Sequence, residues 1–151
     1  MTNFSHESNP FASPLPKWFT IAAVLALIWN LMGVMAFVLQ MQMTAEMIAK
    51  LPEAEQALYA NIPLWATIAF AFAVFGGVFG SLALLMKKAA VQLFFMVSLV
   101  GVIMQMFHSF VISNSFEVFG PGGAIMPAMI VVIAIVLVRF TAKAKNNAWI
   151  R

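Results

Sequence analysis

The chain has 151 residues, of which 64% are hydrophobic and 9% are charged, whereas soluble domains carry about 25% charged residues, so an ordinary water-soluble protein is excluded. The net charge of +3 is compatible with nucleic acid, but the placement of the charges, given below, favours a membrane surface, and we expect no nucleic-acid partner. The chain has no cysteine and no aspartate, which excludes disulfides and thiolate metal sites.

The N-terminal segment, residues 1–16, reads "MTNFSHESNPFASPLP" and contains three prolines among several serines and asparagines. This composition predicts a disordered tail. The apolar run that follows is too long for the core of a signal peptide. We therefore expect it to remain in the protein as its first membrane helix.

Four long stretches without charge, the last closed by Arg139, dominate residues 17–143. A helix needs about 20 apolar residues to cross about 30 Å of hydrocarbon. The stretches predict membrane helices near residues 18–43, 64–86, 89–113 and 124–142. Arg139 fits the last of these if its long side chain reaches the interface. The run "IVVIAIVLV" is apolar at every position, which favours helices over barrel strands.

The segment between the first two spans, "TAEMIAKLPEAEQALYANIP", is too polar to cross a membrane. Pro52 followed by Glu53 and Glu55 is typical of a helix start, because proline fits the first turn and carboxylates favour its dipole. The sequence therefore predicts a short amphipathic helix lying on the outer surface.

The basic residues predict the orientation of the bundle. Lys50 falls on one side of the predicted spans, together with three glutamates. The other side carries Lys17, Lys87, Lys88, Arg139, Lys143, Lys145 and Arg151. The positive-inside rule then places both termini in the cytoplasm, including a basic tail of residues 144–151. The expected fold is an all-α membrane bundle of four helices.

Small residues recur along the second span. They are Ala69, Ala73, Gly77 and Ser81 at every fourth position, with Gly76 and Gly80 beside them. Small residues at this spacing let another helix backbone approach closely. The pattern predicts helix packing, and it leaves open whether the partner helix belongs to the same chain or to another copy.

Polar side chains inside the spans gather on two helices. They are Trp29, Asn30 and Gln40 on the first span, and Ser98, Gln105, His108 and Ser109 on the third. On each helix their spacing gives a shared face at similar depth, so we expect one polar seam between these helices. Such a seam either joins helices by hydrogen bonds, at about 0.6 kcal/mol each, or forms a ligand or solute site.

His108 raises the question of a cofactor. A haem commonly takes two axial ligands, and the other histidine, His6, lies at the opposite end of the first span. Zinc would require more histidine, cysteine or carboxylate ligands nearby. A nucleophile–base pair or a dinucleotide-binding loop is not recognisable either. We expect no metal, no cofactor and no enzyme activity, with haem or quinone binding kept as the weakest alternative.

Three segments carry a family resemblance: "PKWFTIAAVLALIWNLMGVMAF", "WATIAFAFAVFGGVFGSLALLMKK" and "VSLVGVIMQMFHSF". With them the chain resembles a family of short bacterial four-helix membrane proteins whose members are often labelled sugar transporters. The resemblance implies an inner-membrane protein of a Gram-negative bacterium, and it carries over no catalytic residue.

Two functions are expected from the sequence. The first is a small non-enzymatic membrane protein that binds or passes a solute through the polar seam, acting as a homo-oligomer in the lipid bilayer. The alternative is a structural or accessory subunit that contacts other membrane subunits.

Overall fold

The computed structural model describes residues 14–151, and every regular element in that range is a helix. Residues 1–13 of the predicted tail lie outside the described residues. Four long helices form the bundle: α1 (Lys17–Met41), α4 (Leu64–Leu85), α5 (Val91–Phe107) and α7 (Ile125–Asn146). Shorter helical segments are α2 (Ala45–Ile48), α3 (Glu53–Ala60), the π-helical turn η1 (His108–Ile112), α6 (Ser115–Phe119) and the 3₁₀ turn η2 (Pro121–Ala124).

The four long helices are long and apolar enough to cross a membrane, with α5 continuing through η1 and α7 preceded by η2. This confirms, for the described residues, the prediction of an all-α chain with four helices long and apolar enough to span a membrane. One boundary differs clearly, since α7 continues to Asn146 rather than ending near residue 142. Lys143 and Lys145 in its last turn favour the negative end of the helix dipole, which explains the extension beyond the apolar run.

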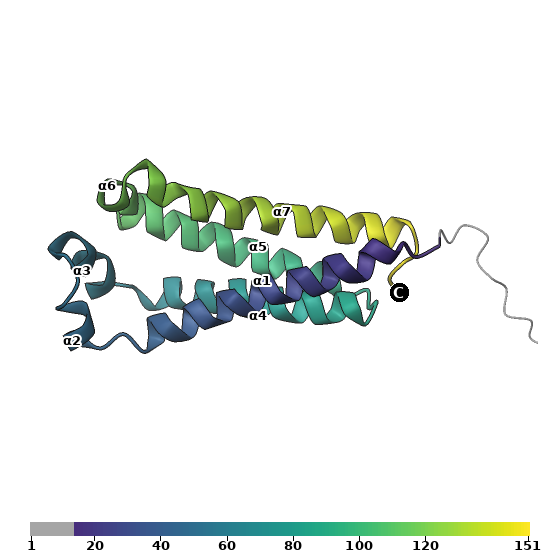
Figure 1. Cartoon of the computed structure of the whole chain (residues 1–151), viewed down its shortest axis with the longest axis horizontal. Coiled ribbons are helices and arrows are strands. Elements are labelled where there is room, and N and C mark those ends of the chain that lie inside the picture. Colours follow the sequence, from purple (N-terminus) through teal and green to yellow (C-terminus); the bar gives the residue numbers. More distant parts are fainter. Residues whose placement is uncertain (1–13) are drawn as a thin grey trace, which may run out of the picture.

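The bundle is elongated, and its helices pack in the order α1, α4, α5, α7 (Figure 1). Helix α4 is the central element, because α1 and α5 both lie against it, whereas α7 packs on α5. All six small residues noted in the sequence of this helix are buried: Ala69, Ala73, Gly76, Gly77, Gly80 and Ser81.

Close backbone contact explains why α4 needs small residues. A Cβ added at Gly76 would lie 3.2 Å from the Phe94 carbonyl oxygen and from the Ser98 nitrogen of α5. In the other direction, a Cβ at Gly101 of α5 would lie 2.6 Å from the Ala69 carbonyl oxygen of α4. These glycines therefore pack α4 and α5 of the same chain together, which answers the question that the sequence leaves open for this part of the pattern.

The two ends of the bundle differ in charge. One end, here called the basic end, carries Lys87, Lys88, Lys143, Lys145 and Arg151. The opposite end, here called the acidic end, holds α2, α3 and α6 with Glu46, Glu53, Glu55 and Glu117 (Figure 1). Helix α3 starts directly after Pro52, as the sequence predicts, and buries none of its residues.

Two left-handed turns close the basic end. The turn after α4 contains Lys87 at φ 57°, and the turn after α7 contains Ala148 at φ 55°. In each turn the following residue reaches back to the helix: Lys88 donates to the Ala83 carbonyl at 2.8 Å and Trp149 to the Ala144 carbonyl at 2.9 Å. This pattern satisfies the last carbonyl groups of a helix and is usually built with glycine.

Candidate functional site: a cavity between α1 and α7

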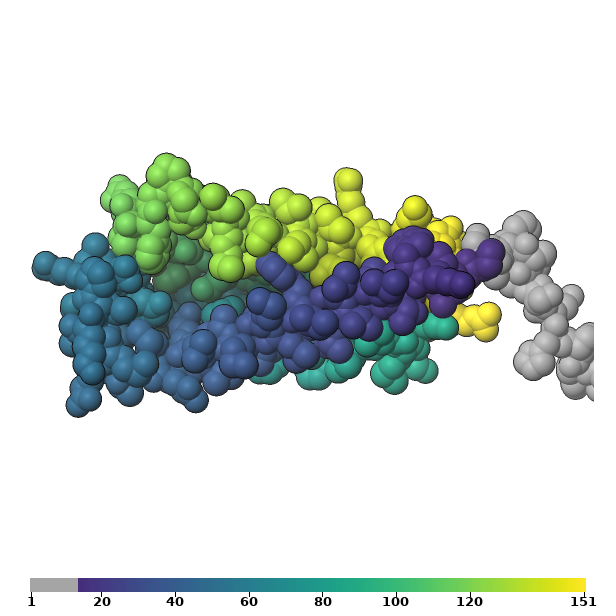
Figure 2. Space-filling view, in the orientation of Figure 1, coloured from purple at the N-terminus to yellow at the C-terminus, as the bar shows by residue number. Residues whose placement is uncertain are grey.

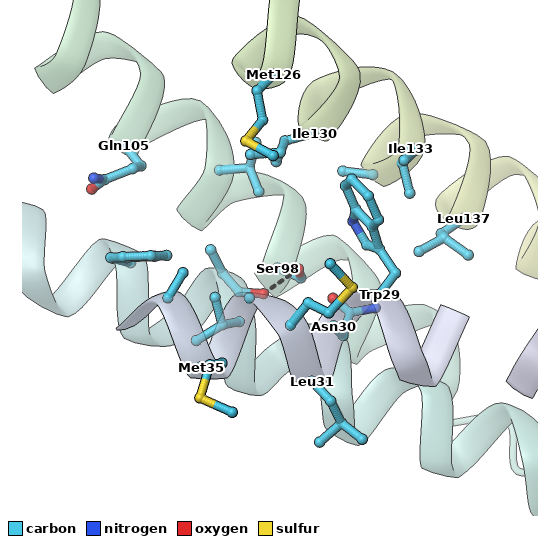
Figure 3. Close-up of a pocket in the computed structure, with 18 of the residues that line it drawn as sticks. Trp29, Asn30, Leu31, Met35, Ser98, Gln105, Met126, Ile130, Ile133 and Leu137 are labelled. Carbon is cyan, nitrogen blue, oxygen red and sulfur yellow. Dashed lines mark hydrogen bonds between the residues drawn. The ribbon is translucent and has the colours of Figure 1, made fainter. Parts of the chain in front are cut away.

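A cavity of about 650 Å³ lies between α1 and α7, above a floor formed by α4 and α5. Figure 2 shows the surface hollowed between these two helices, and Figure 3 shows the side chains that line the space. Most of the lining is apolar, including Met32, Met35, Met106 and Met126. Four of the lining side chains carry a polar group: Trp29, Asn30, Ser98 and Gln105.

The cavity exists because α1 and α7 meet at the basic end and then diverge. At that end Trp18 packs against Phe140 with ring centroids 5.5 Å apart, and Phe19 packs against Trp149 at 5.9 Å. Farther along, α1 follows α4 while α7 follows α5, which leaves a wedge between them (Figure 1). Gly33 fixes the course of α1, since a Cβ there would lie 3.1 Å from Val74 Cγ1 of α4.

Trp29 lies in this wedge. Figure 3 shows its indole reaching from α1 toward α7, beside Ile133 and Leu137. The ring thereby forms the wall of the cavity nearer the basic end. A large, rigid aromatic side chain in this place gives a ligand a broad apolar contact surface at low cost in conformational entropy.

Asn30 faces the cavity from α1, but its amide is bound to neighbouring groups. Its Nδ2 donates to the Ala26 carbonyl at 2.8 Å and to Ser81 Oγ of α4 at 3.3 Å. Ser81 Oγ in turn donates to the Gly77 carbonyl at 2.8 Å. A Cβ at Gly77 would overlap Asn30 Oδ1, so this glycine makes the room for the asparagine. The network joins α1 to α4.

Ser98 also has its hydroxyl engaged. The side chain is buried, and its Oγ donates to the Ala73 carbonyl of α4 at 2.5 Å. The bond joins α5 to α4 across the glycine contact. Ser98 therefore belongs to the floor of the cavity, with its hydroxyl hydrogen directed to the protein itself.

Gln105 differs from these residues because part of its amide has no partner. Its Oε1 is buried and accepts no hydrogen bond, although the side chain lines the cavity. Figure 3 shows Gln105 on α5 at the end of the cavity nearer the acidic end, away from Trp29. A buried acceptor without a donor costs about 1–3 kcal/mol, so this oxygen favours an incoming hydrogen-bond donor.

His108, Ser109 and Gln40 are not among the lining residues of the cavity. His108 is buried with its ring edge-on to Trp65 at 5.4 Å, and Ser113 Oγ lies 3.4 Å from its Nε2. Ser109 Oγ donates to Ser115 Oγ at 3.0 Å. Gln40 Nε2 is buried and has no partner, but it stands apart from the cavity lining. The structure therefore separates these three residues from Asn30, Ser98 and Gln105.

The expected hydrogen-bonded seam between the first and third spans differs from what the structure shows. Within residues 14–151 no side-chain hydrogen bond joins α1 to α5, because Asn30 and Ser98 both bond to α4. Helices α1 and α5 bond to α4 and not to each other because the small residues of α4 let both helices pack closely against it. What remains of the seam is a shared cavity wall rather than a direct contact.

Most of the lining residues gave no sequence signal. The methionines of α1, α5 and α7, with Ile130, Ile133 and Ala134, belong to helices that are apolar on all sides. An apolar side chain facing a cavity and one facing lipid look the same in the sequence. Only the three polar residues and Trp29 could be identified beforehand.

The described part of the chain offers no metal-binding cluster, since no group of three or more histidine, cysteine, aspartate or glutamate side chains could hold an ion there. Comparison with family models, with curated proteins and with solved structures gives no match to this chain.

Proposed function

We propose that this chain is a small non-enzymatic protein of the bacterial inner membrane that binds a lipid-soluble ligand in the cavity between α1 and α7. The observation that carries the proposal is the buried, unpartnered Oε1 of Gln105, a residue in the wall of a mostly apolar space of about 650 Å³. Ligand cavities typically measure about 300–1,000 Å³ and combine apolar walls with a few polar groups.

The lining indicates the chemistry of the ligand. The amide hydrogens of Asn30 and the hydroxyl hydrogen of Ser98 are used within the protein, so these groups do not serve a ligand as donors. The Oε1 of Gln105 is a buried acceptor without a partner. A ligand with one hydroxyl or N–H donor and a long apolar body satisfies this arrangement. A sugar fits it poorly, because each of its several hydroxyl groups would need a partner. The methionines add flexible walls that adapt to an apolar body.

The position of the cavity supports entry from the bilayer. It lies along the apolar part of the spans, and α1 and α7 diverge around it (Figure 2). A ligand dissolved in lipid would enter between these two helices. The excess of basic residues at one end supports an orientation with both termini in the cytoplasm. Membership of the bacterial family that the sequence resembles stays a prediction.

Native mass spectrometry of the full chain in mild detergent tests the proposal, with Gln105→Leu compared to Gln92→Leu. Gln92 is a matched control because it lies on the same helix but outside the cavity lining. We expect wild type and Gln92→Leu to retain a small molecule that Gln105→Leu and the cavity-filling Ala134→Phe lose. Equal retention in all four proteins would contradict the proposal. Recovery of another polypeptide in place of a small molecule would favour the accessory-subunit alternative.

A further inference from the structure

A second cavity, of about 470 Å³, lies at the basic end. Lys87, Lys88 and Arg151 line it, together with the apolar surfaces of Leu15, Met86 and Trp149. Its lining includes no carboxylate side chain. Three cationic side chains thus share one concave space, although they come from two distant parts of the sequence.

Backbone hydrogen bonds hold the cationic residues together. The Arg151 nitrogen donates to the Lys87 carbonyl at 2.8 Å, and the Ala89 nitrogen donates to the Arg151 carbonyl at 2.7 Å. These bonds fasten the segment after α7 to the turn between α4 and α5. The site is therefore built by the fold, and it is not a chance approach of flexible side chains.

In the turn between α4 and α5, Lys87 occupies the left-handed position that glycine usually takes after a helix. Lys87 has φ 57°, a left-handed conformation that disfavours residues with a Cβ. An anion bound among the three cationic side chains would be attracted by each of them.

Trp149 adds an apolar face. Its indole packs edge-on against Trp18 and Phe19, each with ring centroids 5.9 Å away, which holds the ring in place beside the cavity. The site thus combines three cations with an apolar wall, as expected for a headgroup joined to acyl chains.

We propose that this cavity binds the phosphate headgroup of an anionic phospholipid. The cavity lies where α4 and α7 end, which is the level at which headgroups meet the ends of membrane helices. The apolar wall of Leu15, Met86 and Trp149 favours a lipid over a free anion, because the glycerol and the first acyl carbons would cover it. The site is separate from the cavity between α1 and α7.

The test uses the full chain in nanodiscs of equal parts phosphatidylglycerol and phosphatidylcholine, with retained lipids counted by native mass spectrometry. The double variant Lys87→Gln/Lys88→Gln is compared with Lys143→Gln/Lys145→Gln. Lys143 and Lys145 are exposed at the same end but do not line the cavity. Both variants lose the same charge. The nonspecific attraction of about fivefold for each basic residue near an anionic surface acts on both variants alike. The proposal therefore predicts that Lys87→Gln/Lys88→Gln loses more of the phosphatidylglycerol preference than Lys143→Gln/Lys145→Gln does.

Two further variants keep the test decisive if the double variant folds poorly. Lys87→Arg/Lys88→Arg keeps the charge and should keep the preference. Lys87→Gly relieves the left-handed turn and should still weaken phosphatidylglycerol binding. Equal lipid preference in wild type and Lys87→Gln/Lys88→Gln would overturn the proposal. So would displacement of the bound lipid by inorganic phosphate, since the site would then recognise a free anion.

Discussion

At the scale of single residues, three polar side chains from two helices, Asn30, Ser98 and Gln105, share the wall of one cavity. They are recognisable in the sequence because polar groups are rare in apolar spans. Helical spacing gives the face and depth of a residue, but not the helix that it meets. His108 therefore packs against Trp65 of α4 and does not line the cavity that Gln105 lines. Which residue His108 meets depends on how α4 and α5 are rotated about their axes, and the spacing of residues does not give this rotation.

Gly77 offers a sharp test of the contact between α1 and α4. Gly77→Ala places a Cβ against Asn30 Oδ1 and should destabilise the protein by about 1–3 kcal/mol through overpacking. The measurement is unfolding in a denaturing detergent series. Gly122→Ala is the control, because a Cβ there meets nothing within 4 Å. Adding Asn30→Ala should recover part of the loss, and strict additivity of the two changes would refute the contact.

Gln105 should affect stability and binding in opposite directions. Gln105→Leu removes a buried acceptor without a partner, so the ligand-free protein should gain about 1 kcal/mol. The same change removes the proposed bond to the ligand. Thermal unfolding of delipidated protein measures the first effect, with Gln92→Leu as the reference. A loss of stability on Gln105→Leu would show that the oxygen has a partner in the protein.

At the scale of elements, the four spans follow from the length of the charge-free stretches. The π-helical turn η1 did not follow from the sequence; it begins at His108, whose ring packs edge-on against Trp65. Helix α6 and the turn η2 did not follow from the sequence either. These short elements depend on tertiary contacts and on the positive φ of Asn114 and Gly120, which composition does not specify.

The close approach of α4 and α5 should be the most sensitive helix contact. Gly101→Val would force its side chain against the Ala69 carbonyl and the Ala73 nitrogen, both backbone atoms that cannot move aside independently. We expect a loss of about 3 kcal/mol or failure to fold. Ile103→Val, on the exposed face of α5, should change stability by less than about 0.5 kcal/mol. Similar stabilities for both variants would disprove the contact.

At the scale of the whole molecule, charge placement and the small residues of α4 foretold a bundle, but not the order in which its helices pack. That order creates the cavity, because α4 holds α1 and α5, whereas α7 packs along α5 and meets α1 only at the basic end. The apolar walls of the cavity were not predictable, since lipid-facing and cavity-facing side chains share one chemistry. The excess of basic residues at one end, and not the packing order, predicts how the bundle is oriented in the membrane.

The absence of cysteine allows a direct test of orientation. Single cysteines at Ala57 in α3 and at Asn146 at the end of α7 are both exposed positions at opposite ends of the bundle. A membrane-impermeant maleimide added to intact cells should label Ala57→Cys at once and Asn146→Cys only after permeabilisation. The reverse pattern would place the basic end outside.

Gln105 and the apolar walls of the cavity together should bind a ligand with one hydrogen-bond donor. The most direct measurement is quenching of Trp29 fluorescence by a brominated long-chain alcohol, in protein whose three other tryptophans, Trp18, Trp65 and Trp149, are replaced by phenylalanine. The account predicts saturable quenching that weakens about two- to tenfold in Gln105→Leu, stays unchanged in Gln92→Leu, and is weaker with the bromoalkane that lacks the hydroxyl. Quenching that is unsaturable and equal for both probes and all variants would contradict it.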